Sequence, residues 1–403
     1  MEELRGLPED YLEPLLPCLD LLKRCNVTFF YNGTLFNRYW RYFYIIPCVV
    51  VYYIFLSAYM LQVFEGQLEL SELAYVVSVY VVSSQSIVKG IIVVLKSKEI
   101  RSIILELGQA WRTEDLSDAQ IKKKKILLKK LHFVSKGFYF IIIFGTWQYI
   151  LAPLYEILIR KYVLQQEPEP VLPFSCKFPF DPTANWPTYF GVYIFQTYCM
   201  FCLVYYFVGG ELLMVSLCSH ISTEFVLLHE DVRNLTPLRN GKGTLGLGNG
   251  IRKIVRHHGK LIRLSQRLDN IFNVMIFINL SSVTFAICFF SFAVKVAGTA
   301  IEKAKNFVAA LVLVVQIFNL CYYAEVLQDA SSTMADAAYE NLWYNGGIDH
   351  QKNLLFIIIR SQNPCSLTSM KYSPIALNTF TVILSRAWSY FSLISSLYES
   401  ETT

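Results

Sequence analysis

Long apolar stretches dominate this chain, and most of the polar residues gather between them. Several stretches exceed the roughly 18 residues that a helix needs to cross a bilayer. The pattern therefore predicts an all-α integral membrane protein. We expect seven transmembrane helices, with boundaries accurate to about four residues, at Trp40–Val63, Leu73–Leu95, Val134–Ile159, Thr188–Leu217, Ile271–Val296, Phe307–Leu327 and Ser373–Leu397.

The connecting segments contain three features of their own. The glycine-rich stretch Asn240–Gly250 is predicted to be a flexible loop, and a basic amphipathic helix, Ile251–Asp269, follows it. The stretch His350–Pro364 is apolar with polar ends and too short to span a bilayer. No internal repeat or second soluble domain is evident. If several subunits share a pore, the two long amphipathic pieces, Ile251–Phe272 and His350–Pro364, are the cytosolic candidates for holding the assembly together.

The composition agrees with lipid as the solvent for much of the surface. Hydrophobic residues make up 54% of the chain and charged residues only 17%, whereas soluble domains carry about 25% charged residues. The first forty residues are polar and lack a short apolar core followed by a small-residue cleavage site. We therefore expect no cleavable signal peptide, and the first span should itself direct insertion.

The distribution of basic residues predicts the orientation in the membrane. Lysine and arginine are frequent in residues 96–130, which include the run Lys122–Lys125, and again in residues 233–267. The segment between the first two spans, residues 65–72, contains none. Because cytosolic loops carry the excess of basic residues, we expect a cytosolic N-terminus and an extracellular C-terminus. Beside membrane spans, the lysine run favours contact with anionic lipid headgroups over nucleic acid.

Two glycosylation sequons before the first span point the other way, Asn26-Val27-Thr28 and Asn32-Gly33-Thr34. We give the charge asymmetry more weight, because such short sequons often arise by chance. An inside N-terminus reverses the topology of a G-protein-coupled receptor. The chain also lacks Asp-Arg-Tyr after the third span and Asn-Pro-x-x-Tyr in the seventh. A glycan on Asn26 or Asn32 would favour that alternative class.

Catalytic and metal-binding patterns are absent from the sequence. Among the ten cysteines, Cys199 and Cys202 are three residues apart on an apolar helix, where we expect them to pack, and no second Cys-x-x-Cys or Cys/His metal pattern accompanies them. No nucleophile triad, P-loop or pair of catalytic carboxylates is evident. We therefore expect no enzyme activity, no cofactor and no metal. His257 and His258 are predicted to lie on a solvated cytosolic face. Glu211 has two interpretations. One is a functional acid inside the bundle. The other, which we favour, is a residue near the cytosolic end of the fourth span that is satisfied by snorkelling or by a neighbouring base.

The last predicted span carries a narrow polar stripe. At about 100° per residue, a spacing of four, three and four places four serines within about 60° of one another: Ser385, Ser389, Ser392 and Ser396. Leu393 and Leu397 flank the stripe. One interpretation is close helix packing, since small residues four apart let membrane helices approach. The other is a pore lining whose leucines close the path by dewetting. Arg386 favours the second, because an arginine within a span faces protein or water.

Four stretches carry a resemblance to a known family. They are Leu172–Gln196, Val255–Asn273, Tyr322–Asn345 and Ala376–Phe391, in that order along the chain. The chain resembles the insect odorant receptors, a seven-span family of inverted topology, over essentially its whole length.

Two local departures leave this assignment intact. Trp388 stands where the family commonly has the first tyrosine of Tyr-Ser-Tyr-Phe. Glu325 and Asp329 stand where the family more often has a Gly-Asn-Glu-like run.

The resemblance implies an odorant-gated, non-selective cation channel in the plasma membrane of olfactory sensory neurons. Tuning subunits of this family assemble with a common co-receptor, as tetramers. The co-receptor has a longer inner loop between the fourth and fifth spans, and this chain lacks that insertion. The chain therefore resembles a tuning subunit whose partners are the co-receptor, a volatile odorant and membrane lipid.

The resemblance also implies two sites. The odorant pocket is expected in the outer half of the bundle between spans two, three, four and six, at Tyr75, Val79, Thr146, Trp147, Ile150, Tyr193, Gln196, Phe307 and Leu311. Apolar and aromatic walls with a few polar groups suit a volatile ligand. The family's hydrophobic gate lies three and seven residues after the tyrosine of the last motif. Counted from Tyr390, the pore and gate residues are Ser389, Ser392, Leu393, Ser396 and Leu397.

The predicted organisation has four parts: a cytosolic segment at 1–39, six spans with the pocket at 40–327, a cytosolic anchor at 328–370 and the pore-lining span at 371–403. A gustatory receptor is a related alternative, but the Thr-Tyr and Gln-Phe pattern of that family is not matched in the last span. A transporter would show internal symmetry or broken helices in both halves, and the sequence shows neither.

Overall fold

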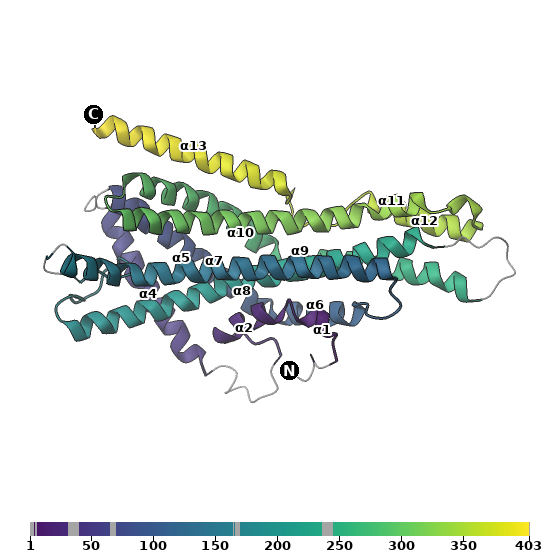
Figure 1. The fold of residues 1–403 in the computed structure, drawn as a ribbon, viewed down its shortest axis with the longest axis horizontal. Coiled ribbons are helices and arrows are strands. Elements are labelled where there is room, and N and C mark those ends of the chain that lie inside the picture. The colour runs from purple at the N-terminus through teal and green to yellow at the C-terminus, as the bar shows by residue number, and fades with distance from the viewer. Residues whose placement is uncertain are drawn as a thin grey trace.

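The computed structural model of the chain is an elongated bundle of long helices with one short hairpin among the residues it describes (Figure 1). It describes residues 6–30, 40–64, 70–163, 170–235 and 245–402, together with Leu4 and Gln165. The second sequon, most of the loop 65–72 and residues 240–244 of the predicted flexible loop lie outside this part of the chain.

Helices make up most of the described structure. In chain order they are α1 (Glu9–Leu12), α2 (Leu16–Arg24), α4 (Tyr42–Phe64), α5 (Leu70–Leu95), α6 (Ser97–Ala110), α7 (Asp118–Tyr162), α8 (Trp186–Arg233), α9 (Leu245–Val296), α10 (Ala300–Ser332), α11 (Met334–Glu340), the 3₁₀ helix η2 (Trp343–Asn345), α12 (Ile348–Ser361) and α13 (Leu377–Thr402). The strands β1 (Thr368–Ser369) and β2 (Ser373–Pro374) pair antiparallel between α12 and α13, with Thr368 opposite Pro374.

Six helices of the described chain, α4, α5, α7, α8, α9 and α10, are long and apolar enough to cross a membrane. They contain the first six predicted spans, except that α4 begins at Tyr42 instead of Trp40. The helix α13 contains most of the seventh and starts at Leu377, because Ser373 and Pro374 belong to β2. Arg386 and the serines lower the hydropathy of α13, so it is not among the six.

Several helices extend far beyond the predicted spans. The helices α7, α8 and α9 have 45, 48 and 52 residues, which at 1.5 Å per residue is more than twice the bilayer core of about 30 Å. The ends of α8 and α9 reach α11 and α12 at one end of the molecule (Figure 1). The predicted basic helix and fifth span are one continuous helix. The prediction of a flexible loop was wrong for residues 245–250, which form the first turns of α9.

Local sequence explains where two of these helices begin. At the start of α7, Ser117 and Gln120 form a capping box, in which each side chain accepts a hydrogen bond from the backbone of the other. Thr299 and Glu302 form the same motif at the start of α10. Such caps satisfy backbone N–H groups that have no partner within the helix.

The helix α8 lies at the centre of the bundle, and most residues of its most apolar stretch are buried. It packs against the other long helices and, around and after its midpoint, against the N-terminal helix α2. Gly209 makes the second contact possible, since a Cβ atom there would lie 2.8 Å from Leu22. The N-terminal segment is therefore part of the core rather than a separate tail.

An ion pair lies inside this bundle. The Lys89 ammonium of α5 is 2.9 Å from the Glu211 carboxylate of α8, and both side chains are 1% exposed. Asn279 of α9 and Gln316 of α10 also donate to Glu211, at 2.9 and 3.3 Å. A basic neighbour does satisfy Glu211, as predicted, but the expected position near water was wrong, because four helices enclose the carboxylate.

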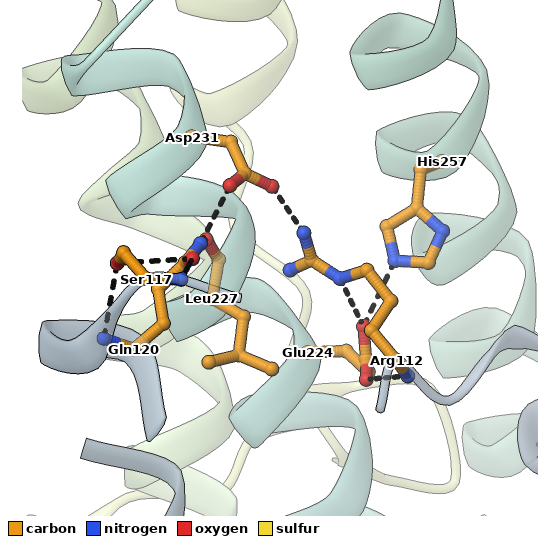
Figure 2. Close-up of polar contacts among 7 residues, drawn as sticks. All are labelled: Arg112, Ser117, Gln120, Glu224, Leu227, Asp231 and His257. Atoms are coloured by element: carbon orange, nitrogen blue, oxygen red, sulfur yellow. Dashed lines mark hydrogen bonds and ion pairs between the residues drawn. The ribbon is translucent and has the colours of Figure 1, made fainter. Parts of the chain in front are cut away.

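A second polar cluster joins the C-terminal part of α8 to α9 and to residues beside α6 and α7 (Figure 2). Arg112, just after α6, donates to Glu224 of α8 from its backbone N–H at 3.0 Å and its Nε at 3.1 Å, and also pairs with Asp231. Gln120 donates to Asp231 at 2.5 Å. His257 Nε2 lies 3.0 Å from the same Glu224, whose side chain is fully buried.

This cluster corrects the prediction for the two histidines. His257 is bound to a buried carboxylate, and His258 is 4% exposed and packs edge-on against Phe225. Neither lies on a solvated face. The reason is that α8 and α9 remain helical and packed together well beyond the membrane, so Glu224 reaches His257 from 33 residues away.

Candidate functional site

An apolar cavity of about 110 Å³ lies between the transmembrane helices. Its wall is formed by α5, α7, α8 and α10, with one residue each from α9 and from the segment between α7 and α8. The lining residues are Val79, Val82, Ser83, Ser86, Ile142, Gly145, Thr146, Tyr149, Phe174, Met200, Leu203, Val204, Phe207, Phe290, Ala309, Val312 and Leu313. No charged residue lines it.

The polar groups of the wall are few, and most have partners. Thr146 donates to the carbonyl of Ile142 at 2.8 Å, and Ser86 donates to that of Val82 at 2.9 Å. Both bonds stay within the side chain's own helix. The hydroxyl of Tyr149 is buried and has no hydrogen-bond partner among the described residues. The cavity can therefore hold an apolar molecule without leaving other wall hydroxyls unpaired.

Phe174 closes one side of the cavity from outside the helices. It lies in the segment between α7 and α8 and is 2% exposed. Gln196 of α8 fixes its backbone by accepting from the Phe174 N–H at 3.3 Å and donating to the Phe174 carbonyl at 2.9 Å. Tyr75 of α5 donates to the neighbouring Pro173 carbonyl at 3.2 Å.

Stacked aromatic rings continue from the cavity wall. Tyr149 stacks on Phe174 with centroids 6.1 Å apart and on Tyr75 with centroids 6.5 Å apart. The ammonium of Lys305, on α10, lies 4.4 Å from the Tyr75 ring centroid and 5.4 Å from that of Tyr149. A positive charge over the ring faces is favourable because the faces carry partial negative charge.

The structure divides the nine predicted ligand residues into groups. Val79 and Thr146 line the cavity. Tyr75 and Gln196 do not line it and instead hold the segment that carries Phe174. Ile150 lies in a separate buried cluster of Tyr189 and Tyr193, the last of which donates to the Ile150 carbonyl.

The other three predicted residues do not face the cavity. Trp147, Phe307 and Leu311 are 47%, 59% and 44% exposed in the single chain and lie on the outer surface of α7 and α10. The resemblance indicated the region of the pocket but not which face of each helix turns toward it, so outward-facing residues were included.

Sequence reasoning missed most of the wall. Phe174 comes from a connecting segment, and nothing in its sequence signals that it folds into the bundle. Gly145 is the exception, since a small residue between large ones within a span suggests free space or close packing. A Cβ atom added there would lie 3.4 Å from Val308, so α7 and α10 approach closely beside the cavity.

All five predicted pore and gate residues share one side of α13. Ser389, Ser392, Leu393, Ser396 and Leu397 are all exposed in the single chain, Leu393 at 59% and Leu397 at 57%. Two of the serine hydroxyls donate to the backbone of α13 itself, Ser389 to Ser385 at 3.0 Å and Ser396 to Leu393 at 2.9 Å. The exposed face is therefore a polar line beside two leucines, without a partner in the described part of this chain.

The opposite face of α13 packs against α9. Phe391, Ile394 and Tyr398 contact the buried pair Phe292 and Ala293, and α13 runs along the outside of the bundle (Figure 1). Beside this contact is a groove of about 630 Å³ lined by both helices, with Arg386 in its wall.

The start of α13 is held by two carboxylates. Glu325 of α10 accepts from the backbone N–H of Leu377 at 2.5 Å. Asp269 of α9 accepts from the backbone N–H and the hydroxyl of Thr368, at 2.7 and 2.8 Å, and from Lys371 at 2.5 Å. The hairpin turn places Met370 and Lys371 at φ 46° and 67°, which costs conformational energy for residues with side chains.

Comparisons with known proteins agree with this architecture. The family model of the 7tm odorant receptors matches residues 69–388. Among Drosophila melanogaster proteins, odorant receptor 13a is 26% identical over 265 residues and odorant receptor 85c is 25% identical over 256 residues. The matches cover 62% and 64% of this chain and 63% of each relative, so the chain aligns with less than two thirds of these relatives.

A solved structure shares the fold over nearly the whole chain. The olfactory receptor OR5 from Machilis hrabei, in complex with eugenol, superimposes with a TM-score of 0.81 at 14% sequence identity, covering 96% of this chain and 100% of that one. A second structure of the same receptor gives a TM-score of 0.79. The protein is a multi-pass membrane protein with the seven-span insect odorant receptor fold, and the chain belongs to the 7tm odorant receptor family.

Proposed function

We propose that this protein is an odorant receptor tuning subunit, which binds a volatile apolar ligand in the cavity between α5, α7, α8 and α10 and gates a cation channel. The cavity carries the proposal: it is apolar, enclosed by helices and aromatic side chains, and free of charged groups. Such a site favours a small uncharged molecule that partitions readily out of water. Family membership supports the same function.

The channel part of the proposal rests on α13. One face of this helix packs on α9, while the face with Leu393 and Leu397 has no partner in the described part of the chain. A single such helix cannot enclose a pore, so several subunits must contribute one each. We assign these partners to a co-receptor and place the assembly, a tetramer, in the plasma membrane of olfactory sensory neurons, with the N-terminus in the cytosol.

The decisive experiment is whole-cell recording from cells that express the chain with and without an insect co-receptor. A panel of volatiles is applied while G-protein signalling is blocked. Rapid inward cation current that requires the co-receptor is the expected result. Responses that the block abolishes would refute the channel and support a coupled chemoreceptor.

A matched pair of variants tests the cavity itself. Ala309→Phe fills space in the wall and is expected to reduce the response to the activating volatile. Phe307→Ala changes the neighbouring outward-facing position and is expected to leave the response intact. Equal responses of wild type and Ala309→Phe would place the ligand elsewhere.

A further inference from the structure

Tyr149 lines the cavity, and its hydroxyl is an unused hydrogen-bonding group. The side chain is 7% exposed, and its oxygen has no partner among the described residues. The hydroxyls of Thr146 and Ser86 are bonded to their own helices, and that of Ser83 interacts with Tyr52. Tyr149 is therefore the wall residue that can offer a new hydrogen bond without breaking an existing one.

A buried phenol without a partner is unfavourable. Buried tyrosine hydroxyls usually find a hydrogen-bond partner, and leaving a buried donor unsatisfied costs about 1–3 kcal/mol. Tyr149 is one of the residues that line the cavity. A ligand oxygen in the cavity would remove this penalty.

The charge around Tyr149 favours an acceptor on the ligand. The ammonium of Lys305 lies 5.4 Å from the Tyr149 ring centroid. Among the described residues it has no ion-pair partner at close range, and Glu302 and Glu156 act on it from further away. This end of the site is thus electropositive, which suits a carbonyl or ether oxygen. A charged ligand is disfavoured, since an ion would lose its hydration against a wall without charged groups.

The volume of the cavity limits the ligand further. An engineered protein cavity of about 150 Å³ holds benzene, and the cavity here is about 110 Å³. A compact molecule of about one ring therefore fits with small adjustments of the wall. A long alkyl chain would require the helices to separate.

We propose that this receptor is tuned to compact, neutral volatiles that carry one hydrogen-bond acceptor, such as a cyclic or aryl ketone, and that Tyr149 donates to that acceptor. The proposal rests on the proposed function and specifies the ligand class of the same site. It assigns the discrimination between a ketone and a hydrocarbon of the same shape to a single hydroxyl.

The test compares ligands that differ only in the acceptor. Cyclohexanone is paired with methylenecyclohexane, and acetophenone with isopropenylbenzene, because a C=CH₂ group replaces C=O at nearly the same volume. Currents are recorded from the chain with its co-receptor. The wild type is expected to respond to each ketone at about 3- to 10-fold lower concentration than to its alkene, the range that one net hydrogen bond gives.

Tyr149→Phe removes the hydroxyl and keeps the ring. This variant is expected to lose the preference for the ketone while its response to the alkene stays unchanged, which also shows that it folds. Tyr189→Phe is the matched control, because the Tyr189 hydroxyl donates to the Val171 carbonyl at 2.9 Å and lies outside the cavity wall. The control is expected to keep the ketone preference.

Three results would overturn the inference while leaving the odorant function standing. The first is an equal shift for ketone and alkene in Tyr149→Phe. The second is a wild-type receptor that responds equally to the ketone and the alkene of each pair, a result that can be obtained without any variant. The third is activation by 2-tridecanone at lower concentrations than by cyclohexanone, which would contradict the size limit. Failure of every volatile to open a current would instead refute the proposed function, and the inference with it.

Discussion

Replacing Glu211 with glutamine tests the ion pair buried inside the bundle. The change removes the counter-charge of Lys89 while keeping nearly the same side-chain size. The ammonium would then face an uncharged amide oxygen and the ring of Phe207, whose centroid is 4.1 Å away. With 1% of either side chain exposed, water cannot replace the lost partner.

The expected magnitude follows from this burial. Breaking a buried pair by removing one member costs about 3–5 kcal/mol, because the other charge remains uncompensated. Lys89→Met should cost less than Glu211→Gln, since the Glu211 carboxylate keeps the amide donors of Asn279 and Gln316. The double variant Lys89→Met/Glu211→Gln removes both charges and should recover most of the loss.

The assay is thermal unfolding of the detergent-solubilised assembly, at one scan rate and one co-receptor ratio, together with the amount of receptor at the cell surface. Asp20→Asn, which neutralises the exposed acid of the Arg24–Asp20 pair, is the control, since exposed pairs contribute about 0–1 kcal/mol. A double variant no more stable than Glu211→Gln alone would refute the reasoning, because the two charges would then not depend on each other.

Three further predictions concern α13 and the topology. Leu393→Ala or Leu397→Ala should raise the current without ligand, because a smaller side chain weakens dewetting of the closed path; unchanged resting current in both variants would remove these leucines from the gate. Glu325→Ala should alter gating or lower stability by about 1 kcal/mol, because it removes the cap on α13. Asp329→Ala, on the exposed side of α10, should have neither effect. Equal effects of the two variants would count against the cap. An epitope tag at the C-terminus should be reached by antibody on intact cells and one at the N-terminus only after permeabilisation, and the opposite pattern, or a glycan on Asn26, would reverse the predicted orientation.

The apolar pattern alone located the first six of the seven membrane helices, because span formation in lipid is a local property: some 18 consecutive apolar residues suffice whatever surrounds them. The same locality explains why the serine line and its leucines on α13 were visible in the sequence. Helical periodicity fixes which residues share a face, and Leu393 and Leu397 do lie on the exposed side with Ser392 and Ser396.

The lengths of the helices, in contrast, do not follow from the local sequence. The helix α8 continues to Arg233 because its polar end bonds to Arg112, Gln120 and His257, which come from three other segments (Figure 2). Hydropathy falls where a helix leaves the membrane, so the predicted spans ended there although the helices did not.

The site depended most on the tertiary structure. Lys89 and Glu211 are 122 residues apart, and the sequence offers no signal that they pair. Phe174 reaches the cavity only because Gln196 and Tyr75 hold its backbone against the helices. The sequence by itself determined the membrane class, the number of spans and the polar face of α13, because short-range periodicity and solvent preference decide them. Which faces turn inward, and therefore which side chains form the cavity, was decided by the packing of helices that are distant in sequence.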